Sequence, residues 1–407
     1  MYMGVRGKKK HIIVFAVVAV IAVVGAATTF VVYNGNKKNE APTTAQAPAQ
    51  QAESPKDVAQ NDTTITMLAT GDLLPHNSVN ANAKSADGGY NYVQFFDKLT
   101  PYFKNNDIVF CNQESTTAGD LPITGYPTFN APSAFSRDIN AVGCNVVNLA
   151  NNHMADYGQA GITGTLATWA NLPNKLAING VNNSANEQQV SYFTAKGKKI
   201  GFVSFTYLSN NKNVADYALN TFNDSLVQKL VSEADKNADF VIVSAHWGAE
   251  GDANPDTGEK EWAQKLVANG ADLVIGTGPH ILQPVETITA GGKTGTVWYS
   301  LGNLLSTQLK SHELIGGLAR ISIDTKDNAM KISNMSFVPT YMHYEWSPAD
   351  QQAENLLARK NLMLYPLWDA GAAMQTARFD MTKEQAFAHV NATINKNNNV
   401  TVLTSQQ

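Results

Sequence analysis

The chain has 407 residues, of which 43% are hydrophobic and 16% are charged, a composition typical of a globular protein and not of a disordered or collagen-like one. Residues 1–38 hold six basic residues and no acidic one, so the remaining 24 basic and 34 acidic residues give the rest of the chain a formal charge of −10. Such an acidic body argues against nucleic acid as the main partner.

An apolar segment near the amino terminus predicts a membrane span. Ile12 to Val32 is an uncharged run of 21 residues, which as a helix covers about 31 Å, the thickness of a bilayer hydrocarbon core. Four basic residues at positions 6–10 precede it, and positive charge stays cytoplasmic. We therefore expect residues 1–33 to be the cytoplasmic tip and transmembrane anchor of a single-pass type II protein in the cell membrane, with an extracellular body. A signal peptide cleaved near Ala26 is the alternative.

The composition changes again after this segment. Residues 34–62 are rich in Ala, Pro, Gln, Thr and Asn and hold no aromatic residue, which predicts a flexible linker. Residues 63–344 then form the body. In residues 345–407, two helix-like stretches, Pro348 to Leu364 and Thr382 to Ile394, predict a helical appendage.

Short apolar runs alternate with amphipathic stretches through the body, which predicts an α/β fold. Two late strands, Leu318 to Ile323 and Met330 to Val338, predict a hairpin and therefore a mixed sheet. The expected helices are Pro132 to Val142, Gly158 to Leu172, Asn223 to Lys236 and Glu259 to Asn269. The earlier strands are Thr64 to Thr70, Ile108 to Asn112, Asn145 to Ala150, Ile200 to Thr206, Phe240 to Ala245, Asp272 to Gly276 and Val297 to Leu301.

The cysteines limit the chemistry. Cys111 and Cys144 are the only two, and both lie in apolar runs expected to be buried strands. Two cysteines this far apart form neither a disulfide framework nor a CxxC site. Whether they pair with each other stays open at this stage.

Polar side chains follow six of the apolar runs. In an α/β sheet the carboxyl ends of the strands line the crevice where ligands bind, so we expect these segments to form one site. Their Asp, Glu, Asn and His side chains are ligand types suited to Mn, Fe or Zn. The six segments are Gly71-Asp72, Asn112-Gln113-Glu114, Asn151-Asn152-His153, His246-Trp247-Gly248-Ala249-Glu250, Gly278-Pro279-His280 and Gly302-Asn303.

Each of these signals has a purely structural alternative when taken alone. Asp72 can be a turn residue after Gly71, and Asn151 and Asn152 can cap the following helix. His76 and His312 lie outside the pattern, and we expect both at the surface.

The ordered set of motifs resembles the CapA-type poly-γ-glutamate capsule-synthesis family, whose domain is similar to a calcineurin-type metallophosphatase. The resemblance runs from Thr64 to about Leu305 and implies a layered α/β/β/α sandwich with mixed sheets. The matching segments are ATGDLLPH, VFCNQES, VVNLANNHMADYG, SAHWGAE, DLVIGTGPHILQPVE and WYSLGNLL.

The resemblance also implies roles for individual residues. One or two divalent metal ions (Mn, Fe or Zn) would be held by Asp72, Glu114, Asn152, His246 and His280. Catalytic roles fall to three residues: His153, His246 and, as a substrate-facing or supporting carboxylate, Glu250. Asn151 and Asn303 would line the site.

Two positions depart from the metallophosphatase pattern. Leu74 stands where the first motif, Asp-x-His, has its histidine, and Gly278 stands where the last motif, Gly-His-x-His, has its first histidine. The loss of two imidazoles weakens at least one of the two metal positions.

The resemblance implies an extracytoplasmic component of poly-γ-glutamate biosynthesis or export, with metal-dependent hydrolysis as the expected chemistry. Its partners would be an anionic polymer such as poly-γ-glutamate and the subunits of a membrane synthase or export complex. One alternative is a non-catalytic, polymer-binding accessory subunit with a degenerate metal site, and another is a cell-surface phosphoesterase. An anionic polymer would be repelled by a body of charge −10 unless metal ions or local basic patches offset that charge.

Overall fold

The computed structural model describes residues 63–326, 330–377 and 380–406, all within one compact unit, Gln60–Gln407. The expected cytoplasmic tip and anchor (1–33) and linker (34–62) lie outside the described residues. Within the described ranges, the helices are all too short or too polar to cross a membrane.

The larger of two β-sheets has nine strands and carries the first part of the site. Its order is β14-β13-β12-β1-β2-β3-β4, with β11 paired to β1 and β15 paired to β13. The β1–β4 strands are parallel, whereas β12, β13 and β14 pair antiparallel, so the sheet is mixed as expected. The strands are β1 (Thr64–Leu73), β2 (Ile108–Gln113), β3 (Val146–Asn148), β4 (Ala177–Asn179), β11 (Asn303–Leu305), β12 (Ile315–Asp324), β13 (Lys331–Glu345), β14 (Lys360–Pro366) and β15 (Thr401–Val402).

The smaller sheet has six strands in the order β5-β6-β7-β8-β10-β9. Its central strands β6, β7, β8 and β10 run parallel, and antiparallel β5 and β9 form the edges. The central strands are almost entirely buried, as expected for parallel strands covered on both faces. The strands are β5 (Ser191–Ala195), β6 (Lys198–Thr206), β7 (Phe240–His246), β8 (Leu273–Thr277), β9 (Leu282–Ala290) and β10 (Lys293–Leu301).

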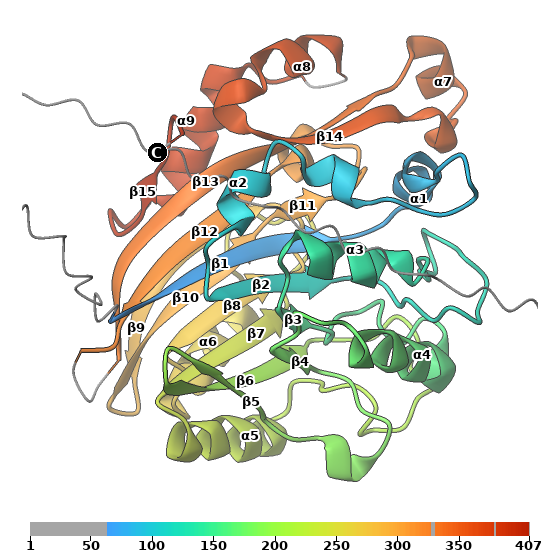
Figure 1. Cartoon of the computed structure of the whole chain (residues 1–407). Coiled ribbons are helices and arrows are strands. Elements are labelled where there is room, and N and C mark those ends of the chain that lie inside the picture. Colours follow the sequence, from blue (N-terminus) through green and yellow to red (C-terminus); the bar gives the residue numbers. More distant parts are fainter. Residues whose placement is uncertain (1–62, 327–329, 378–379, 407) are drawn as a thin grey trace, which may run out of the picture. The chain divides into compact units, whose positions relative to one another are not determined.

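The two sheets pack face to face between layers of helices (Figure 1). A shared core holds side chains from both sheets, including Phe110 of β2 against Phe202 of β6, with ring centroids 6.2 Å apart. A second core lies between the smaller sheet and helices α5 (Asp224–Asn237) and α6 (Thr257–Ala268). Helices α3 (Ala134–Val142) and α4 (Gly158–Ala170) lie on the side of the larger sheet. This arrangement is the expected α/β/β/α layering.

Local signals set the helix boundaries. The Asn223 side chain accepts a hydrogen bond from Leu226 N at 2.9 Å and so caps α5. At the start of α6, Asp256 and Glu259 form a reciprocal capping box. The four helices expected in the body are all present, and short α1 (Asn77–Ala83) and α2 (Thr100–Phe103), which lack a clear apolar periodicity, were not expected.

The segment 345–407 differs from the expected helical appendage. It holds α7 (Pro348–Gln352), α8 (Gly371–Thr376) and α9 (Lys383–Ile394), but the expected long helix from Pro348 to Leu364 is replaced by a short one followed by β14. Strands β14 and β15 both pair with β13, so the segment completes the larger sheet. Leu362 and Leu364 alternate with more exposed neighbours, a period of two that fits a strand.

Cys111 and Cys144 form a disulfide, which answers the question that the sequence left open. Cys111 lies in β2, and Cys144 lies just before β3, the neighbouring strand. Both residues are fully buried. The bridge therefore ties together two of the strands whose ends carry site residues.

Candidate metal centre

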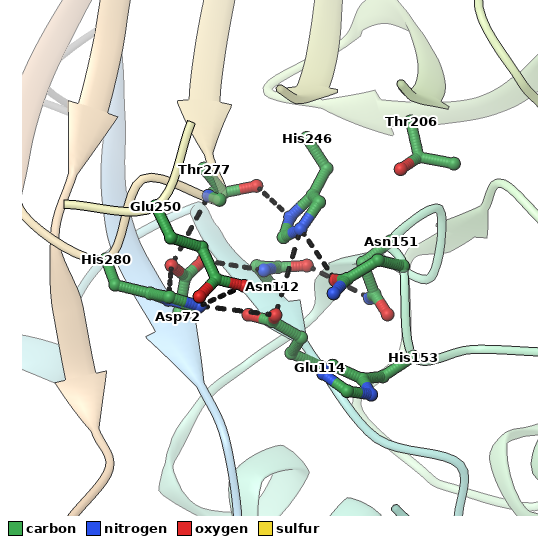
Figure 2. Close-up of polar contacts among 12 residues, drawn as sticks. Asp72, Asn112, Glu114, Asn151, His153, Thr206, His246, Glu250, Thr277 and His280 are labelled. Atoms are coloured by element: carbon green, nitrogen blue, oxygen red, sulfur yellow. Dashed lines mark hydrogen bonds and ion pairs between the residues drawn. The ribbon is translucent and has the colours of Figure 1, made fainter. Parts of the chain in front are cut away.

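The candidate site lies where strand ends of the two sheets meet. Asp72 lies at the end of β1, Glu114 follows β2, and His246 ends β7. His280 follows β8, and Figure 2 shows the four side chains converging. All four residues are buried, although their chain positions span more than 200 residues.

Asp72 and His280 form a buried ion pair. The Nδ1 atom of His280 lies 2.9 Å from Asp72 Oδ2 and 3.1 Å from Asn303 Oδ1, two acceptor oxygens, so Nδ1 carries a proton. Burial alone would raise the pKa of Asp72, but the hydrogen bond and the positive charge of His280 bring that pKa below its ordinary value. Burial alone would lower the pKa of His280, whereas the charge of Glu114 and the Asp72 hydrogen bond raise that pKa to about 10.

The backbone at His280 is unusual, because its φ is +63°, in the left-handed region. A non-glycine residue there costs about 1 kcal/mol or more. In this backbone conformation the His280 imidazole lies within hydrogen-bonding distance of Asp72 and Asn303 at the candidate centre.

Glu114 has two buried carboxylate oxygens without a hydrogen-bond partner among the described residues. Oε1 lies 3.7 Å from His246 Nε2 and 3.8 Å from His280 Nε2, too far for hydrogen bonds. Burial raises the pKa of Glu114 well above its ordinary range. A buried carboxylate without donors is costly, and a bound cation would remove that cost.

The donor atoms of Asp72, Glu114 and His280 lie within 4.8 Å of one another. Two carboxylates and the imidazole of His280, which would give up its Nε2 proton on binding, are a donor set that suits a divalent transition metal. The residues present therefore fit a metal ion. This finding agrees with the expected divalent metal, without selecting one metal.

His246 and Asn152 lie on the other side of Glu114. His246 Nε2 is 3.0 Å from Asn152 Oδ1, and its Nδ1 is 3.0 Å from Thr277 Oγ1. Burial lowers the pKa of His246 to about 3, so the imidazole is neutral. A neutral imidazole and an amide oxygen are both metal donors, which makes this pair a second, weaker candidate position.

His153 is oriented by neighbours of its own. Its Nδ1 lies 2.8 Å from Asp156 Oδ2, and its ring packs edge-on against Phe129 with centroids 4.5 Å apart. The side-chain amide nitrogen of Asn210 lies 3.2 Å from His153 Nδ1 and 3.4 Å from Nε2, and the Asn210 backbone N–H donates to Asn152 O. Nδ1–H therefore donates to Asp156, and Nε2 is the ring nitrogen that a substrate could contact.

Buried amides support Asp72 from behind. Asn112 Nδ2 donates to Asp72 Oδ1 at 2.7 Å, and Asn112 Oδ1 accepts from Asn148 Nδ2 at 2.8 Å and from Asn151 Nδ2 at 3.3 Å. Asn151 also donates to Gln113 O at 2.8 Å. These bonds fix the orientation of the Asp72 carboxylate.

The structure brings together all nine residues expected at the site, but they do not share one environment. Glu250 is the most exposed: its side chain is 69% exposed and Oε1 lies 4.0 Å from His280 Nε2. The other eight are buried. The roles expected for the nine remain predictions.

His76 is a correction to the sequence analysis, which placed it at the surface. It is buried, with Nδ1 3.2 Å from Leu74 O and its ring 5.5 Å from that of Phe129. Its position, at the start of α1 and beside Phe129, could not be predicted from the local pattern. His312 is not buried, in line with the expectation.

The geometry accounts for one of the two departures from the metallophosphatase pattern. Gly278 has a φ of +110°, and a Cβ atom there would lie 2.6 Å from Trp247 O. A histidine therefore does not fit at this position without a rearrangement of the backbone. Leu74 is buried and donates its backbone N–H to Leu305 O.

Sequence reasoning missed several supporting residues. Thr277, Asn148 and Asp156 contact the expected ligands or His153, yet none of them stood out as a candidate. Asp156 lies three residues after His153 inside a motif that was already singled out, so that spacing was an available signal. Asn210 lies in a loop with no such signal.

Fold and site define a class: a two-sheet α/β/β/α protein with a carboxylate and imidazole centre at the strand ends. The family model described as "Bacterial capsule synthesis protein PGA_cap" matches residues 66–308. The chain therefore belongs to this bacterial capsule synthesis family, and the resemblance inferred from the motifs is confirmed.

Two relatives carry names from the same area. The chain is 30% identical to "PGA biosynthesis protein CapA" of Bacillus subtilis (strain 168) over 273 residues, covering 64% of this chain and 68% of that protein. It is 27% identical to "Capsule biosynthesis protein CapA" of Bacillus anthracis over 319 residues, covering 74% and 70%.

Solved structures give weaker similarities. A calcineurin-like phosphoesterase, YfkN from Bacillus subtilis, has a TM-score of 0.40 and 14% identity, covering 68% of this chain and 90% of that chain. A hypothetical protein from Thermus thermophilus has a TM-score of 0.41 and 14% identity, covering 68% and 98%. Scores this low do not establish a shared fold.

Proposed function

We propose that this chain is a membrane-anchored, extracytoplasmic protein of poly-γ-glutamate biosynthesis or export, and that it hydrolyses the polymer with the help of a divalent metal. Family membership and the names of the two relatives support the polymer. The main support for a bound metal comes from Glu114. Its buried carboxylate oxygens lie beside Asp72 and His280 and receive no hydrogen bond from any described residue.

Asp72, Glu114 and His280 would hold the metal, which we propose to be Mn, Fe or Zn. Asn152 and His246 offer a second position, weakened because Gly278 supplies no imidazole. When bound, such a metal polarises the scissile group and lowers the pKa of water toward neutrality.

The surrounding residues have separate tasks in this proposal. Asn112 and the Gly278 N–H, whose nitrogen lies 3.3 Å from Asp72 Oδ2, keep the Asp72 carboxylate in place. His153, held by Asp156 through Nδ1, would turn Nε2 toward the substrate and, once protonated there as well, would donate that proton to the leaving group. Glu250, exposed at the mouth of the site, would contact substrate.

Localisation outside the cytoplasm is supported by the disulfide between Cys111 and Cys144, since such bonds persist in oxidising compartments. We propose that residues 12–32 anchor the chain and that the body meets the subunits of a membrane synthase or export complex. An impermeant amine label applied to intact cells should react with the body. Labelling only after lysis would contradict this topology.

The hydrolytic proposal is tested with the full chain, poly-γ-glutamate and added Mn²⁺, Fe²⁺ or Zn²⁺, by measuring polymer length. We expect shortening that needs metal and falls at least about 100-fold in His246→Ala, consistent with the loss of a catalytic group. Lys360→Gln, an exposed change on β14, should leave the rate unchanged. Polymer that stays intact with metal bound would refute hydrolysis.

A non-catalytic, polymer-binding accessory subunit is the second candidate. The replacement of two imidazoles by Leu74 and Gly278 favours it. In that case the polymer would bind and keep its length, with or without metal.

A further inference from the structure

A concave site separate from the metal centre lies at the junction of the body with residues 345–407. It is a cavity of about 330 Å³. Its apolar rim includes Leu356 and Leu357, and its polar lining includes His76, Gln308 and Arg359. Leu357 is 59% exposed, so the cavity opens to solvent there.

Arg359 is the chemical feature of this cavity. The residue is only 4% exposed, yet the described part of the chain supplies no carboxylate in an ion pair with its guanidinium. Nε donates to Leu356 O at 2.8 Å, and Nη1 donates to Thr307 O. The guanidinium also lies over the Tyr344 and Trp346 rings, at 5.6 and 5.8 Å. Carbonyl oxygens and aromatic rings do not neutralise the charge of a buried guanidinium, so an anionic partner would stabilise it further.

The other charges around the cavity nearly cancel. Lys310 Nζ lies 3.2 Å from Glu313 Oε1, so this lysine is already paired. His76 is neutral, because burial and the nearby charge of Arg359 lower its pKa to about 3. The net charge of the lining is therefore about +1, which matches a monoanion better than a dianion such as phosphate.

The cavity and the metal centre share one chain segment, residues 303–308. Asn303 contacts His280 at the metal centre, and its Nδ2 donates to Gln308 Oε1 in the cavity lining. Thr307 connects the same segment to His76, with its backbone nitrogen 3.3 Å from Nδ1. A short hydrogen-bonded segment therefore links the cavity to the candidate metal centre.

We propose that this cavity binds one carboxylate of an acidic chain, with Arg359 as the counter-ion and the leucine rim against the adjoining methylene groups. Arginine offers a planar, bidentate fork that matches a carboxylate. The pairing also explains how an acidic body holds an anionic polymer, through a local cation. The inference rests on the proposed function only in identifying that chain with the polymer processed nearby.

The test is calorimetric binding of a γ-linked glutamate hexamer to the full chain, with a matched pair of variants at Leu357. Leu357→Glu places a carboxylate at the exposed rim, whereas Leu357→Gln adds a side chain of the same size without charge. We expect Leu357→Glu to weaken binding about tenfold and Leu357→Gln to change it less than about twofold. Arg359→Gln, where it folds, should weaken binding at least about tenfold, and Lys360→Gln should not.

Equal affinities for the Leu357→Glu and Leu357→Gln proteins would overturn the proposal. So would tighter binding of inorganic phosphate than of the hexamer, which would make the cavity a phosphate site. The same titration in Glu114→Gln separates the two proposals. If Glu114→Gln weakens hexamer binding and Leu357→Glu does not, the polymer binds at the metal centre alone, and the proposal that it binds in this cavity is refuted. If Leu357→Glu weakens hexamer binding but the chain does not hydrolyse the polymer, the cavity proposal is supported and the hydrolytic proposal is refuted.

Discussion

Glu114 is buried next to His246 and His280, and neither of its carboxylate oxygens accepts a hydrogen bond from the part of the chain that the structure describes. A metal bound to Asp72, Glu114 and His280 would stabilise the folded chain by about 2.7 kcal/mol at a hundredfold excess over Kd. We expect Glu114→Gln to lose this metal-dependent rise in melting temperature. The metal-free variant should unfold within about 1 kcal/mol of wild type, because burial already favours the neutral form of the Glu114 carboxyl and the glutamine amide is neutral as well.

The matched control is Glu250→Gln. That carboxylate also lies 4.0 Å from His280 Nε2, but its side chain is 69% exposed. It should keep the metal-dependent stabilisation in differential scanning fluorimetry. A similar loss in both variants would mean that the carboxylates act through general charge and not as ligands.

The candidate site residues were singled out from their places at strand ends, and the structure brings these side chains together; their roles stay predictions. Asp72, Glu114 and His280 could be found in this way, since parallel strands present their carboxyl ends at one edge. The supporting contacts could not: Asn148 and Asp156 depend on how loops fold back, which has no local periodicity. The prediction for His76 was wrong for the same reason, because its burial depends on Phe129, far along the chain.

At the scale of elements, β1 approaches the turn between β10 and β11 so closely that a side chain is excluded between them. A Cβ atom at Gly71 would lie 1.9 Å from Gly302 O. We expect Gly71→Ala to destabilise the fold by about 3 kcal/mol or more and to displace the adjacent Asp72. Urea unfolding measures this. Gly119→Ala, with its nearest atom at 4.0 Å, is the control and should change stability by less than about 1 kcal/mol.

The capping box of α6 predicts a pH dependence of stability. Burial raises the pKa of Glu259 to about 7 from its ordinary value of 4.5. The carboxyl of Glu259 therefore binds a proton more tightly in the folded state than in the unfolded state. The stabilisation that this protonation gives to the folded state is complete below pH 4.5 and is lost as pH rises through about 7. Glu259→Gln should reduce the fall in melting temperature between about pH 5 and pH 8. An unchanged slope would show that this carboxyl does not titrate there.

Elements with strong apolar periodicity were predicted correctly, and edge elements were not. Strands β2, β7 and β8 are buried throughout and β1 is buried from Met67 onward, and the sequence displays these apolar runs directly. Strand β14 was predicted to be helical, and that prediction was wrong because the pairing of β14 with β13 lies outside any local pattern. Such pairing is a tertiary effect that overrides local propensity.

At the scale of the whole molecule, the disulfide joins neighbouring strands across a sequence separation of 33 residues. Removing the disulfide raises the conformational entropy of the unfolded chain and should lower the free energy of unfolding by about 3 to 4 kcal/mol. We expect the Cys111→Ala, Cys144→Ala double variant to unfold at lower urea concentration, with the same metal content at low temperature. Equal urea midpoints for variant and wild type would show that the bridge does not form in the native protein.

We propose that Asp72, Glu114 and His280 hold a divalent metal where the two sheets meet. The most direct test of this proposal is the metal content of the full chain, purified without chelator or nickel column, beside that of Asp72→Asn. We expect about one equivalent of Mn, Fe or Zn in the wild type and less than about a tenth of that in the variant. Equal metal content in both proteins, or none in either, would contradict it.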